Sequence, residues 1–358
     1  MSRVGSAVLC FDGEPMRITF TSSARKDIVS RGKSDKEEQR HIASAIAPSE
    51  ELAHGYAVSD PVLQQIGNTP LVRHPAANVW CKMERDSPTL SHKDRLALGM
   101  LLELRSRGEL VDGQPVVEAS SGNMAGGVAL ACNRLGHPCT IVSPETASPI
   151  KMGFVRALGA ELIQVPPAAP DAPAHYQNRA EAIAQETDAL YVNQYERALN
   201  REVHYNWTGP ELWEQIADRS ISAIVAAVGS GGTLSGIGQY VNARDASIRI
   251  VGVDAEASNI SKDFYGEDRG EYDTVIEGLG QHRTTAAINF DVINEIRSVP
   301  DDVAIERAIH EAAEHGLLLG LSSGAVMEVA RDIADERTAV VAIVHDGAEQ
   351  YFHQIDAW

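Results

Sequence analysis

From residue 62 onward, short apolar runs alternate with longer segments whose apolar positions recur at helical spacing. In the first half this pattern predicts strands at 79–83, 115–118, 139–142 and 161–165, and helices at 95–107, 124–135, 150–158 and 176–186. In the second half it predicts strands at 223–228, 248–253 and 339–344, and helices beginning at 233 and spanning 303–315. Regular alternation of this kind predicts two three-layer α/β domains with mainly parallel sheets, in which ligands bind beyond the carboxyl ends of the strands.

Residues 1–60 follow a different pattern. Two short strands are expected at 7–11 and 16–21, around the turn residues Asp12-Gly13-Glu14-Pro15. The segment 35–47 is polar enough for an exposed helix. We expect a hairpin and helix that cover a neighbouring surface or contact a partner subunit.

Charge limits the classes of ligand. The 358 residues include 31 basic and 50 acidic side chains, which give a formal net charge of −19. Such an acidic chain is a poor partner for nucleic acid or an anionic membrane. An anionic ligand therefore needs a local binding device.

The cysteines predict a reducing compartment. Cys10, Cys81, Cys132 and Cys139 show no CxxC spacing, and no secretory signal with a hydrophobic core is visible. No apolar run approaches the roughly 20 residues that span a bilayer. We therefore expect a soluble cytoplasmic protein, and the scattered histidines predict no metal site.

The segment Gly229-Ser230-Gly231-Gly232-Thr233 follows a β-branched strand and opens a helix. Unpaired N–H groups at a helix start, next to glycines without side chains, favour a phosphate. A nucleoside-triphosphate loop would need a lysine that is missing here, and a GxGxxG pattern begun at Gly229 fails at Leu234. A dinucleotide site with Asp254, or a tight turn without ligand, are the alternatives.

Two further segments indicate a binding site when they are considered together with this loop. Ser120-Ser121-Gly122-Asn123 has the same strand-loop-helix form and suits a carboxylate, although alone it would be an ordinary helix cap. Lys93, within Ser91-His92-Lys93-Asp94-Arg95, would alone be part of a solvated charged face. Together with a third small-residue loop, Gly320-Leu321-Ser322-Ser323-Gly324, they indicate a lysine-bound cofactor that carries a phosphate.

These segments together resemble the fold-type II pyridoxal-phosphate enzymes, which have the tryptophan synthase β-like fold, and specifically the cysteine synthase and cystathionine β-synthase family. The resemblance spans about residues 60–350 and follows the family's order. Its further motifs are Ile66-Gly67-Asn68-Thr69-Pro70-Leu71-Val72, Asn193-Gln194-Tyr195 and Thr208-Gly209-Pro210-Glu211.

The resemblance implies that pyridoxal 5'-phosphate forms a Schiff base with Lys93, which also acts as the base on the α-carbon. Asn123 would hydrogen-bond the phenolic oxygen of the cofactor. Ser322 would face the pyridine nitrogen, where a hydroxyl limits carbanion delocalisation and favours chemistry at the β-carbon. The phosphate would bind Gly229, Ser230, Gly231, Gly232 and Thr233, and the substrate would bind Ser120, Ser121, Gly122, Met124 and Gln194.

The implied reaction is β-replacement on an O-activated L-serine, O-acetylserine or O-phosphoserine, through an aminoacrylate intermediate. A small nucleophile would complete cysteine or a related β-substituted alanine. The resemblance also implies a homodimer, with a large cofactor-binding domain from residues 61–92 and 201–358. A small mobile substrate domain would comprise residues 93–200, with 1–60 as an N-terminal extension.

Three departures from the family pattern lie where side chains should meet substrate. His92 stands before the lysine, Met124 replaces the usual threonine, and Gln281-His282-Arg283 replaces a small and aromatic continuation. His92 is expected to pack behind the lysine, and Arg283 to form a surface salt bridge. The three departures together favour a specialised synthase, such as one that makes a 2,3-diaminopropionate precursor with an amine nucleophile. A serine or threonine dehydratase and a non-catalytic binding protein are the alternatives.

Overall fold

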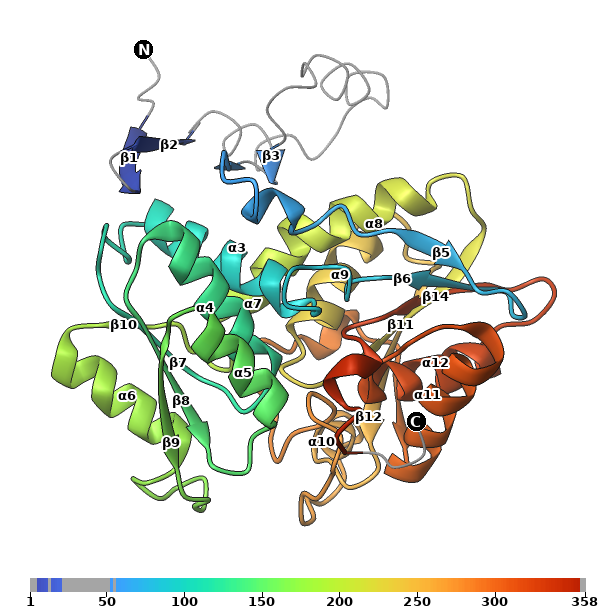
Figure 1. Cartoon of the computed structure of the whole chain (residues 1–358). Helices are drawn as coiled ribbons and strands as arrows, with labels where there is room; N and C mark the ends of the chain where they lie inside the picture. The colour runs from blue at the N-terminus through green and yellow to red at the C-terminus, as the bar shows by residue number, and fades with distance from the viewer. Residues whose placement is uncertain (1–4, 12–13, 21–51, 54–55, 355–358) are drawn as a thin grey trace.

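The computed structural model describes residues 5–11, 14–20, 52–53 and 56–354, and Figure 1 shows how their elements are arranged. Near the N-terminus, β1 (Gly5–Phe11) and β2 (Glu14–Phe20) pair antiparallel, which confirms the predicted hairpin. The short strands β3 (Leu52–Ala53) and β4 (Tyr56–Ala57) complete that sheet in the order β1-β2-β4-β3. The helix expected at 35–47 lies outside the described residues.

A four-stranded parallel sheet has the order β10-β7-β8-β9. Its strands are β7 (Val116–Ala119), β8 (Cys139–Pro144), β9 (Glu161–Val165) and β10 (Leu190–Tyr191). The helices around it are α3 (Lys93–Ser106), α4 (Asn123–Leu135), α5 (Pro149–Ala157) and α6 (Tyr176–Thr187). Neighbouring strand residues alternate between faces: Val116 packs with α3 and α4, whereas Val117 packs with α6.

A six-stranded sheet has the order β13-β12-β11-β14-β6-β5 and is parallel except for β5. Its strands are β5 (Leu71–Arg73), β6 (Val79–Lys82), β11 (Ile221–Ala227), β12 (Arg249–Ala255), β13 (Glu295–Val299) and β14 (Ala339–Ile343). One face packs against α8 (Gly209–Ile216), α9 (Gly232–Asn242) and α10 (Ile260–Tyr265). The other packs against α11 (Asp301–His315) and α12 (Leu321–Ile333).

The two parallel sheets lie side by side in Figure 1, with helices on both faces of each. This confirms the predicted α/β class. Chain order passes from β5 and β6 to the four-stranded sheet and back to the six-stranded sheet. The domain boundaries at 93 and 200 stay a prediction. None of the helices described here is both long and apolar enough to cross a membrane.

One predicted loop is wrong. Gly320-Leu321-Ser322-Ser323-Gly324 is the first turn of α12, with Gly320 immediately before the helix. Serine and glycine are weak helix formers, but this turn is held by packing because Leu321 and Ser323 are buried. The connection to α8 also differs from a plain helix: α7 (Leu199–Val203) continues into a π-helix, η2 (His204–Thr208).

Candidate active site

A cavity of about 580 Å³ brings the predicted site residues together between the two parallel sheets. Those that line it are Lys93, Ser120, Ser121, Gly122, Asn123, Met124, Gln194, Gly229, Ser230, Gly231, Thr233 and Ser322. Gly232 instead packs closely against Asn200, because a Cβ on this glycine would lie 1.9 Å from Asn200 Oδ1. Segments far apart in sequence therefore meet in one cavity of a size typical of small-molecule sites.

Lys93 is the first residue of α3, and its half-buried side chain faces the cavity. Its Nζ lies 3.5 Å from Ser230 Oγ. Burial lowers the pKa of Lys93 to about 8, against the opposing effects of the Glu118 and Asp346 carboxylates. A larger share of the amine is therefore neutral and nucleophilic at pH 7 than for an ordinary lysine.

The glycine-rich loop lies between β11 and α9. Gly231 has a φ of 81°, a conformation that side-chain-bearing residues rarely adopt, and it turns the chain into the helix. The loop is held from outside, because Thr285 Oγ1 donates to the Ser230 carbonyl at 2.6 Å and Asn200 Nδ2 donates to Ser230 Oγ at 3.1 Å. The start of an eleven-residue helix thus points at the cavity, which suits an anion.

The Ser120 loop lies between β7 and α4, so a second helix start faces the same cavity. Gln194 lines the cavity from another segment, and its carbonyl accepts from Asn200 Nδ2 at 2.9 Å. Behind them Glu118 is fully buried and accepts from the Asn193 N–H at 2.8 Å. Burial raises the pKa of Glu118 to about 8 despite such backbone hydrogen bonds. The segment that carries Gln194 is therefore fixed to the end of β7.

The residues that depart from the family pattern divide into two groups. His92, Met124, Gln281 and His282 line the cavity. The ring of His92 is buried and lies edge-on to His345, with 4.9 Å between ring centroids. Burial, followed by the charge of Lys93, lowers the pKa of His92 well below its ordinary value, so it is neutral. Arg283 instead forms an exposed ion pair with Glu196, as expected.

Several cavity residues were not predicted from the sequence. They are Lys151, His175, Tyr176, Gln177, Tyr195, Tyr272, Thr274, Ile276, Glu277, His345 and Asp346. His204 was also missed: it lies in the π-helix and hydrogen-bonds Thr233 Oγ1 at 3.1 Å. For His345 and Asp346 a signal existed, because these polar residues directly follow a predicted strand.

A buried cluster of charges lies beneath the start of α3. Arg95 donates to Glu84 from Nε at 2.9 Å and to Glu211 from Nη1 at 2.7 Å. Glu211 also accepts from the backbone N–H groups of Asn68 and Thr69, each at 2.9 Å. The motifs at 66–72 and 208–211 are thereby joined to the helix that begins at Lys93.

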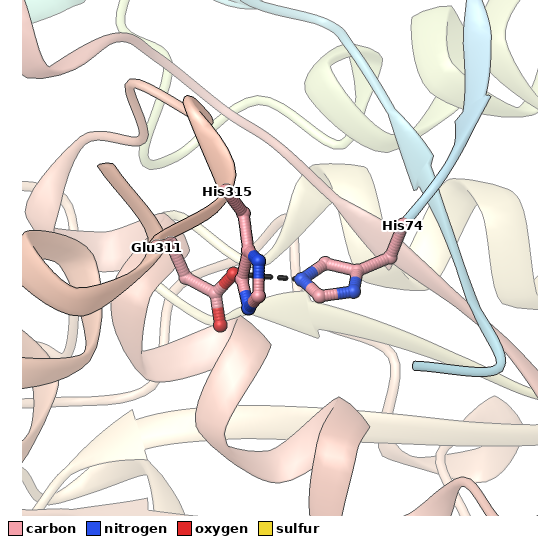
Figure 2. Close-up of side chains that lie close together, drawn as sticks. All are labelled: His74, Glu311 and His315. Carbon is pink, nitrogen blue, oxygen red and sulfur yellow. Dashed lines mark hydrogen bonds and ion pairs between the residues drawn. The ribbon is translucent and has the colours of Figure 1, made fainter. Parts of the chain in front are cut away.

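Figure 2 shows a second cluster, made of His74, Glu311 and His315. None of the three lines the cavity. Its possible ligand atoms lie within 4.8 Å of one another. However, His74 Nδ1 accepts from the Ala76 N–H at 3.1 Å, so its Nε2 carries the proton and donates to Glu311 at 2.7 Å. Glu311 also accepts from Arg331 at 2.8 Å. A protonated Nε2 and a neighbouring guanidinium make this a hydrogen-bond network rather than a cation site.

Comparison with known proteins agrees with this geometry. Residues 62–346 match the family model described as pyridoxal-phosphate dependent enzyme. A cysteine synthase of Staphylococcus aureus is 33% identical over 302 residues, which are 82% of this chain and 95% of that protein. Cysteine synthase 1 of Emericella nidulans is 32% identical over 336 residues, 87% of this chain and 90% of that one.

Among solved structures, the crystal structure of O-ureido-L-serine synthase superposes with a TM-score of 0.77 at 26% identity. The match covers 84% of this chain and 95% of that one. The chain belongs to the cysteine synthase family of enzymes that depend on pyridoxal 5'-phosphate.

Proposed function

We propose that the enzyme catalyses β-replacement on an O-activated L-serine. The main support is that Lys93, two helix starts suited to anions and the neutral hydroxyl of Ser322 all line one cavity. Two helix starts match the two anionic groups of the system, the cofactor phosphate and the substrate carboxylate. The similarity to cysteine synthases supports the same reaction class.

The residues present fit the cofactor. At Gly231 a Cβ would lie 2.0 Å from Ile288 Cγ1, so only a bare backbone fits between the loop and its neighbour. We assign the phosphate to residues 229–233, the phenolic oxygen to Asn123 and the pyridine nitrogen to Ser322. When bound, pyridoxal phosphate withdraws electrons from the α-carbon of an attached amino acid.

The remaining steps fall to side chains of this chain. Ser120, Ser121 and Gln194 would bind the substrate carboxylate, and Lys93 would move the α-proton off and back. The Lys93 amine is suited to that role because its pKa of about 8 lies close to neutral pH. Closing the small sheet over the cavity would exclude water and protect the reactive carbon from hydrolysis.

The second substrate is the nucleophile, and the side chains around the cavity bear on its identity. His175, Gln177, Tyr272 and His282 add a polar wall to the cavity, which favours a nucleophile that is larger than sulfide and has more hydrogen-bonding groups. An amine that gives a 2,3-diaminopropionate precursor is therefore a second candidate beside sulfide. Family likeness also favours a homodimer in the cytoplasm, which mass in solution and cell fractionation would test.

Product analysis tests the proposal. The holoenzyme is offered O-acetyl-L-serine, O-phospho-L-serine or L-serine, each with sulfide, a thiol or an amine, and products are identified by mass spectrometry. A β-substituted alanine from one activated serine supports the proposal. Pyruvate formed at the same rate with and without every nucleophile would instead establish a dehydratase.

A further inference from the structure

The segment after β14 connects the loops of the site to one another. The His92 N–H donates to the His345 carbonyl at 2.8 Å, and the His345 N–H donates to Ser323 Oγ at 2.9 Å. The Gly320 N–H donates to the Asp346 carbonyl at 2.9 Å. This segment therefore fixes the start of α3, which carries Lys93, against the start of α12, which carries Ser322.

The side chain of Asp346 extends this connection to a third loop. Its Oδ2 accepts from Asn123 Nδ2 at 2.7 Å and from the Tyr351 hydroxyl at 2.5 Å. The residue is 1% exposed, and its Oδ1 has no hydrogen-bond partner within the described part of the chain. A Cβ on Gly320 would lie 2.0 Å from that Oδ1, so the glycine before α12 makes room for the carboxylate.

Lys151 comes next in this chain of contacts, and its positive charge favours the ionised form of the buried carboxylate. Lys151 Nζ, from α5 beside the four-stranded sheet, donates to the Tyr351 hydroxyl at 3.2 Å. Lys151 also pairs with Glu277 at 2.6 Å and is itself 2% exposed. A buried carboxylate is costly unless hydrogen-bonded and compensated, and this chain of contacts supplies both. The contacts run in sequence from Asn123 to Asp346, Tyr351, Lys151 and Glu277.

A carboxylate next to an amide determines how that amide is turned. Asp346 Oδ2 accepts from Asn123 Nδ2, so the NH₂ end of the Asn123 amide faces Asp346. One amide N–H is used there, and the second is left for a ligand in the cavity that Asn123 lines. Without Asp346 the amide would be free to rotate or to turn its carbonyl oxygen toward the ligand.

We propose that Asp346 is a positioning residue that aims the Asn123 amide at the cofactor, with Tyr351 and Lys151 holding Asp346 in place. The proposal rests on the proposed function only in assigning Asn123 to the cofactor. It needs pyridoxal phosphate as ligand and no particular substrate.

The test compares Asp346→Asn, which keeps the shape and removes the charge, with Tyr351→Phe, which removes one hydrogen bond to the carboxylate. Glu311→Gln is the matched control, since it neutralises an equally buried carboxylate outside the cavity. Pyridoxal phosphate is titrated into each apoprotein, and the visible circular dichroism of the bound cofactor reports its orientation. We expect Asp346→Asn to weaken cofactor affinity about tenfold or more and to change the dichroism, with a smaller change in the same direction for Tyr351→Phe.

A double-mutant cycle with Asn123→Ala decides whether Asp346 acts through the amide. If it does, Asp346→Asn changes affinity less than about twofold once Asn123 is alanine. The proposal would be overturned if Asp346→Asn caused the same tenfold loss of affinity in the Asn123→Ala variant. It would also be overturned if Asp346→Asn alone kept wild-type affinity and dichroism. Both readouts use only the cofactor, so failure to convert any activated serine would refute the proposed function and leave this test intact.

Discussion

Replacing Arg95 by methionine tests whether the charge cluster beneath Lys93 supports the fold. Arg95 is fully buried with Lys82, Glu84 and Glu211, of which Glu211 is the most exposed at 7%. The four formal charges cancel in the wild-type protein. Methionine fills much of the same space but leaves two buried carboxylates opposite one ammonium group.

The expected cost follows from what each carboxylate keeps. Glu211 retains Lys82 and two backbone N–H donors. Glu84 retains the Thr69 hydroxyl at 2.6 Å and Lys82 at 3.9 Å, but loses both of its hydrogen bonds to the guanidinium. Removing one partner of a buried ion pair costs about 3–5 kcal/mol, a large share of the roughly 5–15 kcal/mol that stabilises a typical domain.

Urea unfolding of the apoprotein, followed by circular dichroism, measures the change in the free energy of unfolding. Arg179→Met is the control, because Arg179 forms an exposed ion pair with Glu186 at 3.3 Å, and such pairs are worth less than about 1 kcal/mol. Equal losses in the two variants, both under about 1 kcal/mol, would refute the idea that the cluster stabilises the start of α3.

Three further predictions concern the site. Gly229→Ala should lower cofactor affinity at least about tenfold in a fluorescence titration, because its Cβ would lie 2.4 Å from the Gly278 carbonyl oxygen; Gly153→Ala, with open space around its Cβ, should not. The rate of cofactor attachment, followed by absorbance, should rise with pH through a midpoint near pH 8 and then level off, because only the neutral Lys93 amine reacts; a midpoint near pH 10 would contradict the lowered pKa. Arg283→Ala should leave kcat/KM within about twofold, since an exposed ion pair contributes little, and a tenfold loss would assign it to substrate.

Elements with strong periodicity were predictable from the sequence. The strand expected at 161–165 is β9, and the helix expected at 303–315 is α11 extended by two residues at its start. Several elements escaped the prediction, among them α8, β13, β10 and α12. The strand β10 has only two residues, and the helix α12 begins with weak helix formers that tertiary packing holds in place.

The site was predictable where a local motif carries it and not where packing assembles it. Lys93 and the Gly229 loop stand in recognisable segments, and the structure brings them to one cavity. Lys151 reaches the cavity from a helix with no motif of its own, and its contacts with Glu277 and Tyr351 join residues 126 and 200 positions away. Such pairings are products of the tertiary fold and leave no spacing in the sequence.

Two lysines, Lys93 and Lys151, line the cavity, and pyridoxal phosphate is proposed to attach to Lys93. Borohydride treatment of the holoenzyme fixes the cofactor to the lysine that holds it, and peptide mass mapping then identifies that lysine. We expect the modification on the peptide that contains Lys93, and its loss in Lys93→Ala. A cofactor mapped to Lys151, or to any other lysine, would contradict it.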